Sequence, residues 1–178
     1  MSLGMKISRD KAIELVSALL AESREKGPEL AIIGINPTPV GWVVACNSAR
    51  YALNPEARNL LIGGGPYLVD GDDGSVYRIP GETFRVYDWQ AMFRERFKGV
   101  DPPDELLESV RELALSGGRM AALRLLRKEV PSLDIARARE YVGAVMEGRK
   151  PPAGTLAMTR KAEPFSPLPI ERISGPIE

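Results

Sequence analysis

The sequence contains no histidine among its 178 residues. Histidine is the general base of Ser-His-Asp and Cys-His catalysis and a ligand in many zinc sites, so these chemistries are excluded. Chemistry by carboxylates, lysine or tyrosine stays open, as does a cation held by oxygen ligands alone. We expect no catalytic residue, no metal site and no cofactor, and we expect that the chain is not an enzyme.

Cysteine is almost as scarce, because Cys46 is the only one. One cysteine excludes an intramolecular disulfide and suits a reducing compartment. Cys46 stands within the expected strand 42–47, beside Val43, Val44 and Ala45, where we interpret it as a small buried hydrophobe rather than a nucleophile. No apolar run approaches the ~20 residues that span a bilayer, and the start of the chain has no signal-peptide core. We therefore expect a cytoplasmic protein without membrane association.

Neither sign of charge is in excess, because 24 basic residues balance 24 acidic ones. With no global field toward phosphate, nucleic acid is not an expected partner. Acidic residues do gather locally at Asp70, Asp72 and Asp73. This run superficially resembles a calcium loop but lacks the glutamate at position twelve. We interpret it as a hairpin turn, with a weak cation site or an acidic contact for a basic partner as the alternatives.

The first half of the chain predicts one helix followed by short strands. Ser8 caps a helix whose apolar face includes Ile13, Val16 and Leu20, and Gly27-Pro28 ends it. Strands are expected at 30–35, 42–47, 60–62, 67–69 and 76–79, with 50–53 prolonging the second after a kink and a break at 36–39. No helical crossover separates them, which favours an antiparallel meander.

Two features of this half have more than one interpretation. The run Gly63-Gly64-Gly65-Pro66 suggests a phosphate loop, but a strand follows it instead of a helix, which favours a tight turn. The segment 83–98 carries Trp89, Phe93 and Phe97, and it predicts a short helix over the edge or end of the sheet. These aromatic side chains form either a core seam, which we favour, or a binding surface.

The second half predicts three helices and a tail. Asp101 begins the first, the run 116–118 breaks it, and further helices follow at 120–128 and 133–147. From Gly148 the chain is rich in proline and lacks apolar periodicity, which indicates an extended strap or a disordered tail. The predicted fold class is α+β, with an N-terminal helix packed on a short-stranded antiparallel sheet. The predicted domains are 6–98, a helical appendage at 99–148 and the tail at 149–178.

Three stretches, 41–48, 61–70 and 74–77, resemble the immunity protein 35 family. They read Gly-Trp-Val-Val-Ala-Cys-Asn-Ser, Leu-Ile-Gly-Gly-Gly-Pro-Tyr-Leu-Val-Asp and Gly-Ser-Val-Tyr. The resemblance covers roughly residues 6–98 and departs from the family at Ala45-Cys46, where aromatics are frequent. It implies a small bacterial α+β domain that neutralises the secreted toxin of a rival or sibling cell by tight binding. It implies no cofactor and no catalytic set.

A cognate toxin is therefore the expected partner, and no oligomeric state is predicted. Asp70, Asp72, Asp73 and Asp88 are the expected contacts, because acidic side chains suit a basic, nuclease-type toxin. Residues 119–142 are similar to the C-terminal helix pair of the ribosomal stalk protein L7/L12. This similarity leaves open an alternative function, in which a chaperone-like or regulatory module uses the C-terminal helices to dock on a resident protein.

Overall fold

The computed structural model describes residues 4–23, 27–160 and 166–177. The chain forms two compact units, Met1–Pro102 with Ser166–Glu178 and Pro103–Phe165. The predicted α+β class is confirmed. The expected tail does not form a part of its own, because its first residues belong to the second unit and its last residues to the first.

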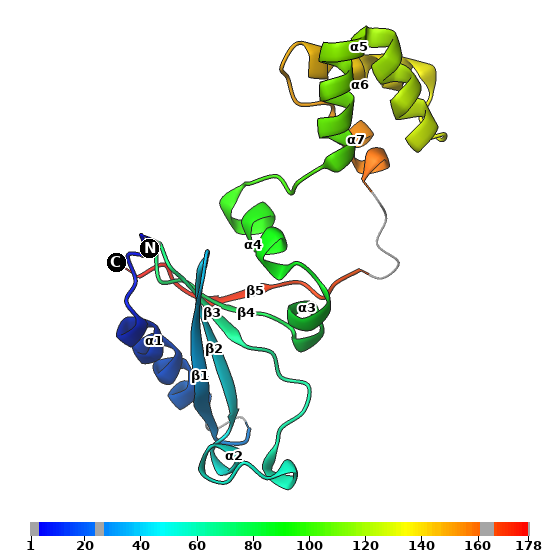
Figure 1. Cartoon of the computed structure of the whole chain (residues 1–178). Coiled ribbons are helices and arrows are strands. Elements are labelled where there is room, and N and C mark those ends of the chain that lie inside the picture. The colour runs from blue at the N-terminus through cyan, green and yellow to red at the C-terminus, as the bar shows by residue number, and fades with distance from the viewer. Residues whose placement is uncertain (1–3, 24–26, 161–165, 178) are drawn as a thin grey trace. The chain divides into compact units, whose positions relative to one another are not determined.

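The first unit contains a five-stranded antiparallel sheet in the order β1-β2-β3-β4-β5 (Figure 1). Its strands are β1 (Leu30–Thr38), β2 (Gly41–Ser48), β3 (Tyr67–Asp70), β4 (Val76–Arg78) and β5 (Glu171–Ser174). The first four strands form the predicted meander. The fifth strand comes from the end of the chain and pairs with β4, so that Tyr77 lies opposite Arg172. The sequence interpretation did not include this strand.

Neighbouring strand residues point to opposite sides of this sheet, so it has two faces. Helices cover both of them. Val44, Val69 and Val76 pack under α1 (Arg9–Glu22), as the sequence predicted. The opposite face, which includes Val43, Leu68 and Tyr77, is covered by α4 (Trp89–Lys98), and α3 (Gly81–Val86) adds Phe84. The single short helix expected at the edge or end of the sheet is thus two helices on one face (Figure 1).

The aromatic residues of α4 form a core seam. Phe93 is fully buried, and its ring meets that of Tyr77 edge to face, with centroids 5.0 Å apart. Trp89 is also buried, and Phe97 lies 4.6 Å from Tyr77 between ring centroids. Edge-to-face and tilted pairs at these separations contribute favourably beyond their buried area. The core interpretation of these side chains is therefore confirmed, and the alternative of an exposed binding surface is wrong for Trp89 and Phe93.

Three predictions about strands are wrong, and α5 begins after its cap Asp104 rather than at the predicted Asp101. Residues 50–53 do not prolong a strand but belong to helix α2 (Ala49–Leu53), because the Ser48 hydroxyl caps it by accepting from the Tyr51 amide at 2.9 Å. Residues 60–62 form no strand and follow the 3-10 turn η2 (Ala57–Asn59). Strand β1 continues through Pro37 to Thr38. It is an edge strand, where a residue without an N–H is tolerated.

Both glycine-containing segments have structural roles in the sheet, although Gly63-Gly64-Gly65-Pro66 forms a bend and not the predicted tight turn. A Cβ on Gly65 would stand 1.7 Å from the carbonyl oxygen of Ile79, so only glycine fits where this segment leads into β3. The run 70–75 connects β3 to β4 with Gly74 at φ +70°, which glycine adopts at little cost. These segments therefore build the sheet.

The second unit consists of α5 (Glu105–Glu129), α6 (Ile135–Met146) and α7 (Ala153–Thr159) (Figure 1). The backbone of Gly118 is non-helical, with φ 78° and ψ 175°, so α5 consists of two helices that meet at this residue. The predicted break at 116–118 is confirmed. Helix α7 lies in the expected tail and buries Leu156 against the core. Within residues 4–23, 27–160 and 166–177, none of the helices is long and apolar enough to cross a bilayer.

Candidate functional site

The segment 49–62, which joins β2 to the glycine run 63–66, exposes large apolar side chains. Leu53 is 88% exposed and Ile62 is 91% exposed, while Leu60 and Leu61 are each exposed to a lesser degree. We call these four residues the apolar loop. Single exposed leucines are normal on proteins, whereas apolar side chains gathered on one exposed segment are typical of interaction surfaces.

Two buried polar residues hold the apolar loop in place. The Asn47 side chain accepts from the Leu61 amide at 2.9 Å and donates to the Leu61 carbonyl at 3.3 Å. The Ser48 hydroxyl donates to the Asn59 carbonyl at 2.6 Å. Both residues are buried at the end of β2. Because its backbone is already fixed, this segment would lose little conformational entropy when a partner covers it.

Sequence interpretation missed the apolar loop because Leu60, Leu61 and Ile62 were assigned to a strand. A signal was nevertheless present: three consecutive apolar residues without alternation stand directly before three glycines. A strand with one solvated face alternates apolar and polar residues. The role of Asn47 and Ser48 could not be predicted from the sequence, because only the structure shows which backbone groups their side chains bind.

The acidic turn is built around an ion pair. Asp70 is 1% exposed, and its Oδ2 atom lies 2.6 Å from Nζ of Lys98 at the end of α4. The same ammonium lies 2.9 Å from Oδ2 of the exposed Asp72. Asp73 accepts from the Ser75 amide at 2.8 Å and so closes the turn. The buried side chain of Asp70 therefore holds the turn to α4 and has no surface to offer a partner.

These contacts shift the pKa of two groups. The hydrogen bond from Lys98, and then its positive charge, lower the pKa of Asp72 from 3.8. Partial burial acts to lower the pKa of Lys98, but its contacts with Asp70 and Asp72 outweigh this effect and raise the pKa above 10.5. Asp72 and Lys98 are therefore both charged at neutral pH, and the lysine offsets part of the acidic charge that the sequence suggested.

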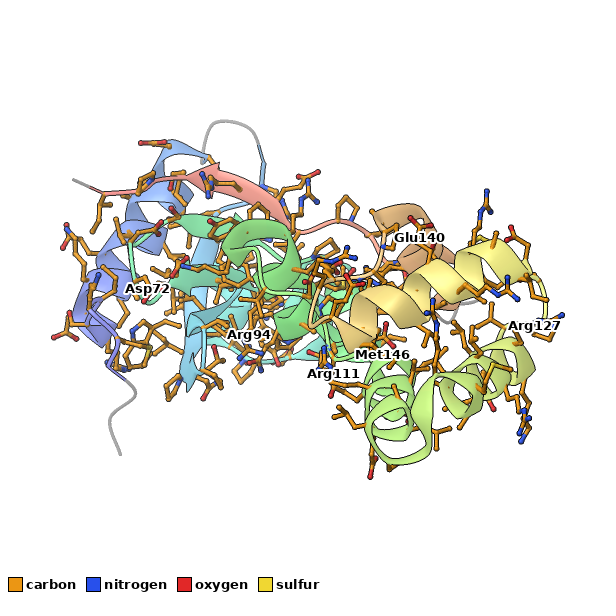
Figure 2. The ribbon with its side chains drawn as sticks, turned by 90° about the horizontal axis from the view of Figure 1, so that it is seen from above. Asp72, Arg94, Arg111, Arg127, Glu140 and Met146 are labelled. Carbon is orange, nitrogen blue, oxygen red and sulfur yellow. The ribbon has the colours of Figure 1, made fainter. Side chains whose placement is uncertain are left out.

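Asp88 does not join this cluster. Its carboxylate accepts from the Ala91 amide at 3.0 Å and caps the N-terminus of α4. Lys98 is the last residue of that same ten-residue helix, so the two ends lie roughly 15 Å apart along its axis. Of the four expected contacts, the structure places Asp72 and Asp73 on one turn, with Asp72 labelled in Figure 2. Asp70 belongs to the same turn but is buried, and Asp88 lies at the N-terminus of α4.

The acidic turn and the apolar loop lie at opposite ends of the sheet. Gly41 at the start of β2 pairs with Asp70, whereas Ser48 at its end leads into α2 and binds the loop. A strand rises ~3.3 Å per residue, so these eight residues separate the two features by about 23 Å. A partner that touches both must therefore span the length of the sheet.

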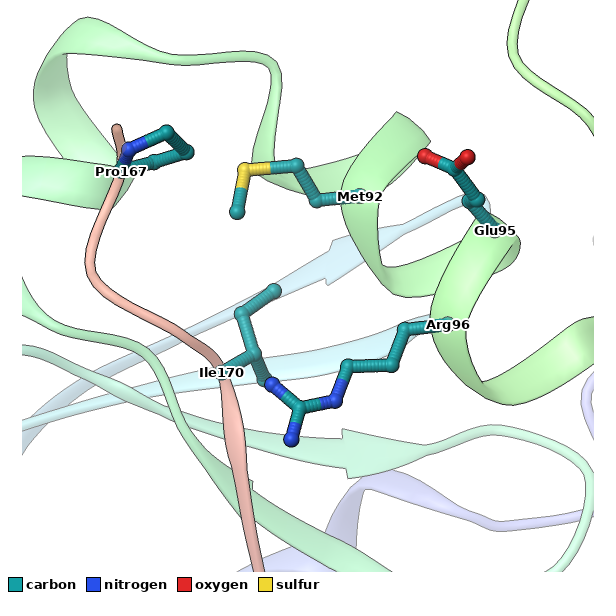
Figure 3. A pocket seen from close by; sticks show the side chains of 5 residues that line it. All are labelled: Met92, Glu95, Arg96, Pro167 and Ile170. Atoms are coloured by element: carbon teal, nitrogen blue, oxygen red, sulfur yellow. The ribbon is translucent and has the colours of Figure 1, made fainter. Parts of the chain in front are cut away.

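A small pocket lies between α4 and the segment before β5. It has a volume of about 280 Å³ and is lined by Met92, Glu95, Arg96, Pro167 and Ile170. Figure 3 shows the guanidinium of Arg96 beside Ile170, with Met92 on the other side. Ile170 is buried and belongs to the aromatic core. The pocket is therefore the outer margin of that core, and its one acid and one cation come from adjacent positions of α4.

Cys46 lies in β2 and packs against the core beneath α1. Burial raises the pKa of the Cys46 thiol to about 11. The thiolate is the nucleophilic form, so this thiol is unreactive near neutral pH. Among the residues that the structure describes, no three cysteine or carboxylate side chains gather where they could hold a metal ion.

Comparison with known proteins gives no relative for this chain. No family model matches the sequence, no curated protein matches it, and no solved structure matches the fold. The resemblances to the immunity protein 35 family and to the ribosomal stalk protein therefore stay predictions.

Proposed function

We propose that this chain is a protein-binding protein that uses the apolar loop as its contact surface, and that its binding neutralises a protein toxin. The exposure of Leu53 and Ile62 on a segment fixed by Asn47 and Ser48 is the observation that carries the first part. Burial of one such side chain contributes about 1.5–3 kcal/mol. A few anchors of this size supply most of the affinity of a protein interface.

Neutralisation of a toxin is supported by the sequence resemblance, in which Asn47-Ser48 and the glycine run are among the shared motifs. In the structure these same motifs border the apolar loop. A toxin of basic, nuclease type would also meet the exposed Asp72 and the half-buried Asp73. Charges at the rim of an interface chiefly raise the association rate, so these two residues are secondary contacts.

Growth rescue tests the proposal. The proteins encoded beside this gene are expressed one at a time in a sensitive host, with and without the full chain. We expect that one of them arrests growth, that the chain restores growth, and that the two proteins copurify. A variant with Leu53→Asp and Ile62→Asp should lose both effects, because each aspartate would be desolvated in the interface.

The matched control is Val86→Asp, which makes the same kind of substitution once, on an exposed apolar residue of α3 in the same unit. All three positions are exposed, so none of the substitutions should change the free energy of unfolding by more than about 0.5 kcal/mol. Rescue by the double variant as efficient as by the wild type would overturn the assignment of the apolar loop. Copurification without rescue would overturn neutralisation and leave protein binding in place.

A further inference from the structure

The second unit carries a groove between the second half of α5 and the start of α6. The groove has a volume of about 380 Å³. Met120, Leu123, Arg124, Arg127 and Lys128 line it from α5, and Ile135 and Arg139 line it from α6. All seven residues belong to the second unit, so the groove is separate from the apolar loop.

Helical periodicity explains why these residues share one face. Positions 120, 123, 124, 127 and 128 recur at three and four residues along α5, as do 135 and 139 along α6. Ala122 and Leu126 fall on the other face of α5 and are fully buried in the core. The groove is therefore a second, outward face of the same helix pair.

The base of the groove is apolar and exposed. Met120 is 62% exposed and Ile135 is 50% exposed, although both belong to helices that contribute to the buried core. Leu123 is partly buried and packs against that core from the groove side. Exposed apolar residues in a concave surface are typical of a site that another chain covers.

The rim of the groove is positively charged. Its lining includes Arg124, Arg127, Lys128 and Arg139 and no acidic side chain. Within the described part of the chain, none of these four cations has a carboxylate within 4.0 Å. Other arginines of the same unit do form ion pairs, as Arg111 does with Glu108 and Arg137 with Asp134. Figure 2 shows Arg127 at the end of the helix pair where α5 leads to α6.

We propose that this groove binds an acidic amphipathic helix of a partner protein. Apolar side chains of that helix, spaced at three and four residues, would cover Met120, Leu123 and Ile135, as in other helix-in-groove complexes. Its aspartates and glutamates would pair with the rim. Nucleic acid fits less well, because its phosphates would leave the apolar base uncovered, and no aromatic side chain lines the groove to stack on bases.

A displayed library of 16-residue helical peptides, selected against the full chain, tests this proposal. We expect enrichment of peptides with net negative charge and with leucine, isoleucine or phenylalanine at positions i, i+3 or i+4, and i+7. The affinity of one enriched peptide is then measured by fluorescence anisotropy. Arg124→Gln with Arg127→Gln should weaken binding about ten-fold or more, and Met120→Ser with Ile135→Ser should do the same.

The control variant, Arg111→Gln with Arg137→Gln, also removes two positive charges from the second unit, but at positions that do not line the groove. It should change the affinity by less than about two-fold. Enrichment of neutral or basic peptides, no enrichment at all, or equal effects of the two arginine pairs would overturn the proposal. A concentration-dependent dimer that the groove variant abolishes would instead assign the groove to a second copy of this chain. None of these results depends on toxin neutralisation, which uses residues of the first unit.

Discussion

Lys98 determines what the acidic turn can offer to a partner. Its ammonium lies within 3 Å of both Asp70 and Asp72, and Asp70 is buried. The pair joins residues 28 positions apart in sequence, so the spacing of the aspartates alone could not reveal it. Three acidic residues in one turn indicated a contact surface, but the structure uses one of them to fix the turn to α4.

Replacement of Lys98 by methionine tests this role. Methionine keeps an apolar stem but leaves the Asp70 carboxylate buried without its cation. We expect a loss of roughly 3 kcal/mol in the free energy of unfolding, near the lower end for a broken buried pair because Lys98 is 27% exposed. Urea denaturation followed by tryptophan fluorescence measures it, since Trp42 and Trp89 both lie in the first unit.

Lys11→Met is the matched control, because Lys11 pairs with Glu14 at 2.8 Å on an exposed face of α1. Exposed pairs of this kind contribute only about 0.5 kcal/mol. Equal losses from the two variants would show that Asp70 does not depend on Lys98.

The pH dependence of this cluster follows from the two pKa shifts. The pKa of Asp72 is lowered from 3.8, so the stabilisation from its ion pair is complete above pH 3.8 and is lost as the pH falls through the lower folded-state value. The pKa of Lys98 is raised from 10.5, so its stabilisation is complete below pH 10.5 and is lost as the pH rises through the higher value. We expect NMR titration to give Asp72 a midpoint below 3.8, and Lys98→Met to return that midpoint toward 3.8. An Asp72 midpoint that does not move in the variant would contradict the assignment.

At the scale of single elements, the segment that bears the apolar loop depends on Asn47. Asn47→Ala removes the groups that bind both the amide and the carbonyl of Leu61. Both hydrogen bonds are only partly buried, so their loss should cost about 0.5–1.5 kcal/mol each. Hydrogen exchange at the Leu61 amide should therefore become faster, and binding of the partner should weaken. Asn54→Ala removes an exposed contact with Glu56 in the same segment, so it should leave this exchange unchanged. Equal exchange rates in the two variants would show that Asn47 does not hold the loop.

The C-terminal strand is part of the first unit and not an appendage. Ile170 is buried in the aromatic core, the Thr83 hydroxyl donates to the Leu168 carbonyl at 2.8 Å, and the Arg172 guanidinium donates to the Tyr77 hydroxyl at 2.8 Å. Ile170→Ala should cost about 2–5 kcal/mol, as cavities in well-packed cores do. Ile173→Ala, at an exposed position of β5, should cost less than about 1 kcal/mol. Tryptophan fluorescence in urea measures both, and similar costs would contradict a structural role for the segment.

The contrast between α1 and β5 shows which elements the sequence could predict. Helix α1 has a cap at Ser8 and a complete apolar stripe, and this information is local, although the helix ends at Glu22, before the predicted stop at Gly27-Pro28. Strand β5 has one large apolar residue in four, and it forms because β4 and the aromatic core provide a place for it. Helix α2 shows the same limit, since five residues contain too little periodicity to distinguish a helix from a strand.

At the scale of the whole molecule, the chain has two candidate contact surfaces of different chemistry, one in each unit. The apolar loop is uncharged at its four defining positions, whereas the groove of the second unit combines an apolar base with four cations. Sequence composition indicated protein binding through absences, but neither surface could be located without the structure. The reason is the same for both surfaces: the sequence does not show whether an apolar residue is exposed or buried.

The most direct test of protein binding through the apolar loop is a quantitative pull-down from the native host with three baits. These are the wild-type chain, the Leu53→Asp with Ile62→Asp variant, and the Val86→Asp control. We expect one protein, encoded beside this gene, to be enriched by the wild type and the control and to be lost from the double variant. Equal recovery of that protein by all three baits would contradict the assignment of the apolar loop as the contact surface.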